Sequence, residues 1–385
     1  MKVEQIYPLV NEATKEALGE EAVVQEDLSN LVDIGTSIFG ANAVDKYVKS
    51  LINHIGKVIF VNRKYAVATP SVLMDSWEFG SVLQKIRAEL PDATENESWE
   101  LEDGQSYDPN IFYRPTVASK FYNSKVTFEI PMSFTERQVK QSFDNVEQLN
   151  AFVSMLYNEV DKSMTVKLDG LVMRTINNFI AQTMHDSFAD PTSFSGKTSA
   201  TAINLLYEYN QQYSESLTYD KALTDKDFIR FAIYRMGVTE KRLARMSKMY
   251  NLGGKERFTS ADKLHTILHA DFASASRVFL QSDTYNPEFT ALPSAEIVPY
   301  WQGSGTDYAL SSTSEVHVST AGGDEVDAKY IIGVMFDRDA LGVTNMDKRV
   351  TSNYNPKAEF YNNWFKYDAG YYNDFDENFV VFYMA

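Results

Sequence analysis

The stretch "NVEQLNAFVSMLYNEVDKSMTVKLDGLVMRTINNFIAQTM", residues 145–184, sets the plan of the molecule. Apolar residues recur in it three or four positions apart, the spacing that lines one side of an α-helix. The pattern holds from Val146 to Met184 and predicts a helix about 55–60 Å long at 1.5 Å per residue. A helix of this length exceeds what a compact domain needs. Because its heptads are not strict and its flanks are rich in strand-forming residues, we expect a spine across a flat molecule rather than a coiled coil.

The stretch "ENFVVFYMA" (377–385) constrains the fold next. It is mostly apolar and predicts a strand. Because both faces of this strand are apolar, we expect cover from the spine helix on one side and from a neighbouring subunit or segment on the other. We place the strand in a sheet beside the aromatic strand "EFYNNWFKYDAGYYND" (359–374). Alternation puts Phe379, Val381 and Tyr383 on one face and Val380, Phe382 and Met384 on the other.

The residues between 65 and 127 predict a long two-stranded excursion with a polar tip. Its centre, "ELPDATENESWELEDGQSYD" (89–108), holds eight carboxylates and no Lys or Arg. This composition is typical of a solvated acidic loop, with a cation site as the alternative. Because long excursions usually serve a function, we expect an interaction arm.

The rest of the chain predicts short helices and strands, and therefore an α+β fold. Residues 1–62 show short runs of helical spacing. The stretch "AKYIIGVMFD" (328–337) predicts a buried strand, and "DRDALGVTNMDKR" (337–349) predicts an exposed loop. The region from 195 to 325 predicts helices at 200–213, 225–236 and 239–250, and strands at 265–269, 278–280 and 315–319.

The composition excludes several classes of protein. The chain has 385 residues, 44% hydrophobic and 23% charged, which is ordinary for a globular protein of two or three domains. Its net charge of -17 and its lack of a basic run make it a poor match for nucleic-acid phosphates or an anionic membrane. Without cysteine it has no disulfides, thiolate catalysis or cysteine metal sites. No stretch resembles a signal peptide or a membrane span, which predicts a cytosolic protein.

Two motifs come near to a metal or cofactor site. His265 and His269 have the i, i+4 spacing of a helical zinc pair, but Thr266 stands where a zinc protease needs a glutamate. The surrounding segment predicts a strand, in which residues four apart lie about 13 Å from each other. Gly196-Lys197-Thr198 matches the end of a phosphate-binding loop, but Pro191 stands where that loop needs a glycine. We therefore predict no catalytic residues, no metal and no cofactor.

The order of these parts resembles the major capsid proteins of tailed bacteriophages, which have the Hong Kong 97-type fold. The resemblance covers most of the chain. It is strongest in the spine stretch and in "IIGVMFDRDALGV" (331–343) followed by "WFKYDAGYYNDFDENFVVFYMA" (364–385). It implies an N-terminal arm at 1–62, an extended E-loop and the start of the peripheral domain at 63–130, the peripheral domain with its spine helix at 131–190, the axial domain at 191–330, and closing strands of both domains at 331–385.

The resemblance implies a structural protein that is not an enzyme. It would self-assemble as pentamers and hexamers into the icosahedral head of a tailed bacteriophage, in the host cytoplasm, around double-stranded DNA that it does not bind sequence-specifically. The implied partners are portal and other head proteins. A separate scaffolding protein is also expected, since no long charged helical leader precedes the arm. Six aromatic residues are our candidates for contacts between subunits, with the core of a local hairpin as the alternative: Trp77, Phe79, Phe112, Tyr113, Phe121 and Tyr122.

Two other functions fit the sequence. An encapsulin, which forms the shell of a cellular compartment, has the same fold and is distinguished by a cargo enzyme encoded beside it. A metal-dependent hydrolase would use His265 and His269, and it predicts stoichiometric zinc in the purified protein.

Overall fold

The computed structural model describes most of the chain. The described residues are 3–51, 72–74, 83–88, 117–138, 146–280, 295–299, 301 and 315–385, with isolated positions between 95 and 114. Within these ranges, positions 20–22, 27, 28, 42, 45, 190–192 and 321 lie outside the description.

Helices and strands alternate irregularly along the chain, which confirms the α+β class. The helices are α1 (Val3–Leu18), α2 (Leu31–Gly40), α5 (Val146–Asp186), α6 (Leu205–Tyr213), α7 (Tyr219–Ala222), α8 (Lys226–Leu243), α9 (Ala270–Ala275) and the π-helical turn η2 (Ser276–Leu280). The strands are β1 (Leu73–Met74), β2 (Leu83–Ala88), β3 (Val117–Tyr122), β4 (Lys125–Thr135), β5 (Ala202–Asn204), β6 (Leu264–His269), β7 (Glu296–Val298), β8 (Val316–Ser319), β9 (Glu325–Ala328), β10 (Ile331–Asp337), β11 (Leu341–Asn355), β12 (Phe360–Asn373) and β13 (Phe379–Tyr383).

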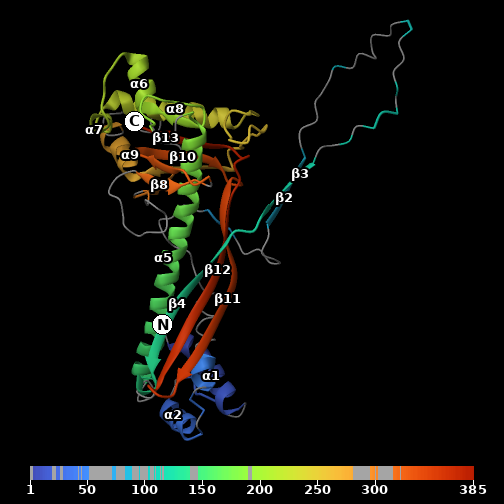
Figure 1. The fold of residues 1–385 in the computed structure, drawn as a ribbon. Helices are drawn as coiled ribbons and strands as arrows, with labels where there is room; N and C mark the ends of the chain where they lie inside the picture. The colour runs from blue at the N-terminus through green and yellow to red at the C-terminus, as the bar shows by residue number, and fades with distance from the viewer. Residues whose placement is uncertain are drawn as a thin grey trace.

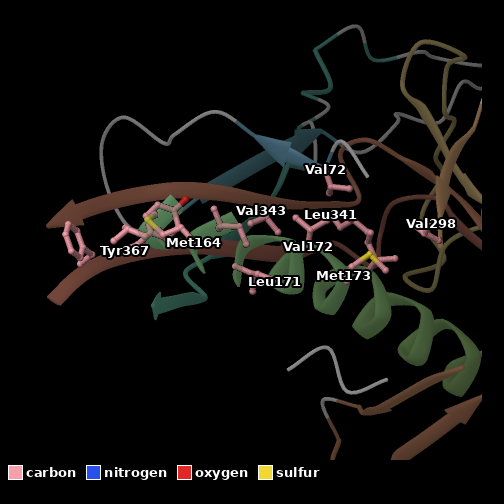
Figure 2. Close-up of a cluster of buried hydrophobic side chains, with 14 of the residues drawn as sticks. Val72, Met164, Leu171, Val172, Met173, Val298, Leu341, Val343 and Tyr367 are labelled. Atoms are coloured by element: carbon pink, nitrogen blue, oxygen red, sulfur yellow. The ribbon is translucent and has the colours of Figure 1, made fainter. Parts of the chain in front are cut away.

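Helix α5 is the predicted spine. It spans 41 residues without a break, so the expected helix is confirmed. Figure 1 shows it running the length of the molecule, from the long strands at one end to a second sheet at the other. Figure 2 shows Met164, Leu171 and Val172 of this helix among the buried side chains beside strand β11. Burying a side chain of this size stabilises the fold by about 1.5–3 kcal/mol, so the apolar stripe fixes the helix against the sheet.

The long sheet has the strand order β1-β11-β12-β4. Strand β11 begins at Leu341 and pairs along β12, so the prediction of an exposed loop over 337–349 is wrong. The polar composition of this segment favours a loop. However, β12 offers hydrogen-bonding partners along its whole length, and Leu341 and Val343 are buried. Tertiary pairing therefore overrides the local preference.

The second sheet lies at the other end of the spine, with the order β5-β13-β10-β6-β7. Strand β13 lies in it between β10 and β5. The prediction that this strand lies beside the aromatic strand β12 is therefore wrong. Both edges of β12 are already hydrogen-bonded, to β11 and to β4, so no backbone position is left for β13.

The prediction that both faces of β13 are covered is confirmed. Phe379 stacks on Phe179 of the spine, with ring centroids 4.0 Å apart. The other face packs in a separate apolar cluster with side chains of α6, α8 and α9, so a segment of the same chain supplies the second cover. Phe379, Val381 and Tyr383 share the spine-side cluster, and Val380, Phe382 and Met384 share the other, as alternation predicts.

The region between 195 and 325 follows the sequence in part. Strands β6 and β8 confirm two of its predicted strands. The two helices predicted at 225–236 and 239–250 are one helix, α8, that ends at Leu243. The strand predicted at 278–280 is wrong, because these residues extend α9 as the turn η2, and a helix once begun continues at low cost.

The N-terminal helices pack on their own chain. Leu9, Val10 and Ala13 of α1 are buried in the same cluster as the spine. Figure 1 places α1 and α2 at the end of the long strands farthest from β13. Helical spacing in this region is thus confirmed where it is described. The domain boundaries at 62, 130, 190 and 330 stay predictions. Residues 331–385 supply strands to both sheets.

Candidate assembly interface

A two-stranded hairpin, β2–β3, projects from the side of the molecule (Figure 1). Its strands pair antiparallel, with Leu83 opposite Tyr122 and Lys85 opposite Lys120. The two-stranded start of the excursion between 65 and 127 is therefore confirmed. Most of the acidic tip (89–108) lies outside the described residues.

The hairpin has two chemically different faces. Residues that lie opposite each other on paired strands point to the same side. Lys85, Arg87 and Lys120 share the side turned toward the body, where each of them meets a carboxylate. The other side carries exposed apolar side chains: Ile86 is 64% exposed, Val117 56% and Phe121 63%. One face thus anchors the hairpin, and the other is available for contact.

The anchor is the acidic turn between β12 and β13. Asp374 is nearly buried, with 3% of its side chain exposed. Its two carboxylate oxygens form ion pairs with both strands of the hairpin. Lys85 Nζ lies 3.3 Å from Oδ2, and Lys120 Nζ lies 3.1 Å from Oδ1. The Asp376 side chain also pairs with Lys120. The turn therefore fixes both hairpin strands at one point.

A second group of charges lies beside the turn. Arg87 pairs with Glu377, whose carboxylate also lies 4.0 Å from Arg257 Nε. Lys263 pairs with Asp339 at 2.8 Å. These side chains line a cavity of about 400 Å³ between the hairpin base and the second sheet. The base of the hairpin is therefore held by ion pairs rather than by an apolar core.

Burial and charge compete at these carboxyls. Burial acts to raise the pKa of Asp374, but the charges of Lys85 and Lys120 outweigh it and hold the pKa below its usual value. At Glu377 burial prevails over the charge of Arg87, and the pKa is raised. Burial also lowers the pKa of Lys85, against the opposing effect of Asp374. Asp374 is therefore the carboxylate whose charge the anchor favours.

Aromatic rings complete the anchor. The rings of Tyr122 and Tyr372 lie 5.2 Å apart between their centroids. Lys85 Nζ lies 4.6 Å from the centroid of the Tyr372 ring, within range of a cation–π interaction. The cation is thus held between a buried carboxylate and an aromatic face.

The structure places three of the six candidate contact residues. Phe112 is 84% exposed and Phe121 63% exposed, so neither is buried in a hairpin core of its own chain. Tyr122 packs on Tyr372 of β12, a contact with the body of the same chain and not with a hairpin core. Trp77, Phe79 and Tyr113 lie outside the described residues.

Sequence reasoning missed the charged anchor. Lys85 and Asp374, two of its members, are 289 positions apart in the chain. The sequence contains two local signs of the anchor. Lys85 and Arg87 lie two apart, on one face of a strand, and Asp374 to Glu377 is an acidic run between two strands. Neither signal identifies the other as its partner.

The two candidate metal ligands do not form a metal site. His265 and His269 lie on β6, which confirms the predicted strand and places them about 13 Å apart. The His265 ring stacks on Phe336 at 5.3 Å, and burial lowers the pKa of His269 against the opposing charge of Asp271. Within the described part of the chain, no three side chains of a metal-binding type gather closely enough to hold an ion.

None of the described helices is long and apolar enough to span a membrane. The spine, the longest of them, instead has charged and polar residues on the side away from the sheet, such as Lys162 and Lys167.

The overall fold of the chain is similar to that of proteins in solved structures. The chain is similar to a protein in the capsid structure of Staphylococcus phage Andhra, with a TM-score of 0.52 and 11% identity over 83% of this chain and 86% of that one. A protein in the capsid structure of the cyanophage P-SCSP1u matches with a TM-score of 0.45 and 11% identity over 85% and 92% of the two chains. A search of curated proteins gives no match. The first likeness supports a capsid-type fold.

A family model identifies the chain more closely. The model of the Phi29-like phage major capsid protein matches residues 10–383, nearly the whole sequence. The chain belongs to this family. The resemblance to tailed-phage major capsid proteins is thus confirmed, and the role of the protein in the phage head is structural. Membership also favours a phage head over the cellular compartment shell and the hydrolase.

Proposed function

We propose that copies of this chain assemble as pentamers and hexamers into the closed icosahedral head of a tailed phage, and that the hairpin of each copy lies over a neighbour. The observation that carries the proposal is the two-faced hairpin. Its inner face is fixed to the body through Asp374, while its outer face presents Ile86 and Phe121 to solvent. An anchored arm with an exposed apolar face is suited to reach another copy.

The energetics fit a shell built from many modest contacts. Burying each apolar side chain of the outer face would contribute about 1.5–3 kcal/mol. The proposed contact is between different surfaces of two copies, and such head-to-tail contacts close into rings when the rotation from copy to copy closes on itself. Each copy then both gives and receives a hairpin, so the closed shell gains from every contact at once.

The remaining assembly details are proposals that family membership supports. We propose a separate scaffolding protein and a portal as partners, assembly in the host cytoplasm, and no catalytic activity. The net charge of -17 suits a wall that encloses DNA without gripping its phosphates. The arm, E-loop, peripheral and axial parts would occupy residues 1–62, 63–130, 131–190 and 191–330, with closing strands at 331–385. Phe112, Phe121 and Tyr122 are the described members of the candidate contact set, and we propose Phe112 and Phe121 as contacts between copies.

The test is a pair of substitutions on the outer face, Ile86→Ser with Phe121→Ser, in protein co-expressed with its neighbouring head genes. Both positions are exposed in one copy, so the variant should fold with an unchanged melting temperature yet lose closed shells on a sizing column and by electron microscopy. Val32→Ser, at a position of α2 that is 54% exposed, is the matched control and should assemble. Wild-type shell yield from the hairpin variant would refute the proposed role of this face.

A further inference from the structure

A groove lies at the C-terminal end of helix α8, and Met246 lines both this groove and the cavity at the hairpin base. Its volume is about 980 Å³. Apolar side chains are unusually accessible in it: Tyr234 is 67% exposed, Met249 63% and Met246 42%. The lining also includes Val238, Arg242 and Arg245. An exposed apolar surface of this kind on a folded chain marks a contact site.

The rim of the groove is basic, in a protein with a net charge of -17. Lys241 pairs with its neighbour Glu240, and Lys248 pairs with Glu256. Arg242 and Arg245 make no ion pair with any other residue that the structure describes. A basic residue near a helix C-terminus interacts favourably with the helix dipole, which explains why Arg242 is basic. It does not account for the exposed tyrosine and methionines, so the groove fits a partner that is both acidic and apolar.

One segment of the chain has this combination. Residues 89–108, between β2 and β3, hold eight carboxylates and no basic residue. Among the described positions there, Asp103 and Asp108 are exposed. Ile111 and Phe112 follow, 54% and 84% exposed. Acidic and apolar residues are thus close in this part of the sequence, which matches the basic rim and apolar floor of the groove.

The hairpin begins beside the groove of its own chain but runs outward from the body. The anchor at Asp374 fixes the hairpin base, and β2 and β3 run outward from the body in Figure 1. From Ala88 to residue 102 the chain reaches up to about 45 Å when extended, whereas α8, with its 18 residues, is about 27 Å long. The segment is therefore long enough to span the α8 region of another copy.

We propose that the acidic segment 89–112 of one copy docks into the α8 groove of a neighbouring copy in the assembled shell. This inference rests on the proposed function and deepens it by naming the receiving surface. Phe112 packs among Tyr234, Met246 and Met249, and the carboxylates face Arg242 and Arg245. Because like charges opposed across an interface cost several kcal/mol, the basic rim also rejects misplaced contacts.

A disulfide tests the pairing directly, since the chain has no native cysteine. The double variant Phe112→Cys with Met249→Cys is co-expressed with the head genes, and its purified shells are oxidised mildly. We expect dimers and longer ladders on a non-reducing gel, and none in either single variant. Phe112→Cys with Lys221→Cys, on the exposed side of α7, is the matched control and should stay monomeric on the gel. Closed shells without the 112–249 linkage would overturn the inference and leave the proposed function intact, whereas loss of all shells, wild type included, would overturn both.

A charge swap tests the chemistry of the pairing. Reversing the rim (Arg242→Glu with Arg245→Glu) or the segment (Asp103→Lys with Asp108→Lys) should each lower shell yield about tenfold or more. Combining all four changes should restore most of it. Lys221→Glu on α7 with Lys226→Glu at the N-terminus of α8, both exposed, should leave the yield unchanged. A combined variant no better than its parents would overturn the pairing. So would rim-reversed shells that form normally but lose DNA, because the groove would then be a nucleic-acid contact.

Discussion

The sheet around β13 and the base of the hairpin bury their residues by opposite means. Strand β13 has apolar side chains on both faces and is covered on both, by the spine and by α6, α8 and α9. The hairpin base buries charges instead, with two lysines converging on Asp374. Apolar packing is strong but not directional, whereas ion pairs fix direction at a net gain that desolvation keeps small. The first region therefore holds one copy together, and the second fixes the direction of the hairpin that we propose as the arm between copies.

The largest expected effect is on the packed sheet. Phe382→Ala should lower the free energy of unfolding by about 3–5 kcal/mol, because Phe382 is fully buried and its removal leaves a cavity. Urea denaturation of the monomer measures this value. Phe258→Ala, at a position 54% exposed, should change it by less than about 0.5 kcal/mol. If both variants lose the same free energy of unfolding, the sheet is no more tightly packed than the surface.

A smaller loss is expected from adding one methyl group to the same sheet. A Cβ at Gly333 of β10 would lie 2.8 Å from the carbonyl oxygen of Ile267, a backbone atom that cannot turn aside. Gly333→Ala should therefore cost about 1–3 kcal/mol by overpacking. Gly237→Ala in α8 is the control, since nothing lies within 4 Å of its added Cβ. Helix propensity predicts that this control gains up to about 1 kcal/mol, and a loss as large as that of Gly333→Ala would contradict the packing argument.

At the hairpin base the expected loss is local. Asp374→Asn removes the carboxylate that two lysines share and leaves Lys85, 15% exposed, without its main partner. We expect a cost of about 1–2 kcal/mol, reduced because Lys120 is 42% exposed and solvent screens it. Hydrogen exchange should show faster opening of β2 and β3 while β10 and β13 keep their protection. Asp227→Asn, in an exposed pair, should change neither region. Uniform loss of protection throughout the chain would show that the anchor is part of the global core.

The smallest effect is a pH dependence of the same anchor. The folded pKa of Asp374 lies below its unfolded value of about 3.9, so its stabilisation is fully present above that value and is lost as the pH falls through the folded pKa. Glu377, with a raised pKa, contributes in the opposite direction over the range just above about 4.3. The loss of β2 amide protection that Asp374 causes should thus begin only below about pH 4. In Asp374→Asn, the protection of β2 amides should no longer fall at low pH. If it falls as in the wild type, other carboxyl groups cause the loss.

The sequence predicts the packed elements better than the charged anchor. The spine and the two faces of β13 follow from periodicity, because a buried face must be apolar along its whole length. The sheet to which β13 belongs does not follow, since it depends on which strand edges are already occupied by β4 and β11. Strand β11 was missed because its partner, and not its own residues, makes it a strand. The anchor joins Lys85 to Asp374 across most of the chain, and no local pattern records that contact.

The most direct test of the account is an electron cryomicroscopy map of the particle that the wild-type chain forms with its neighbouring head genes. We predict a closed shell of pentamers and hexamers in which Ile86 and Phe121 of each hairpin are buried against a neighbouring copy, while Lys85 and Lys120 stay on Asp374 of their own. A shell whose hairpins leave this apolar face in solvent, or fold back over their own chain, would contradict the assignment of the hairpin as the arm that joins copies.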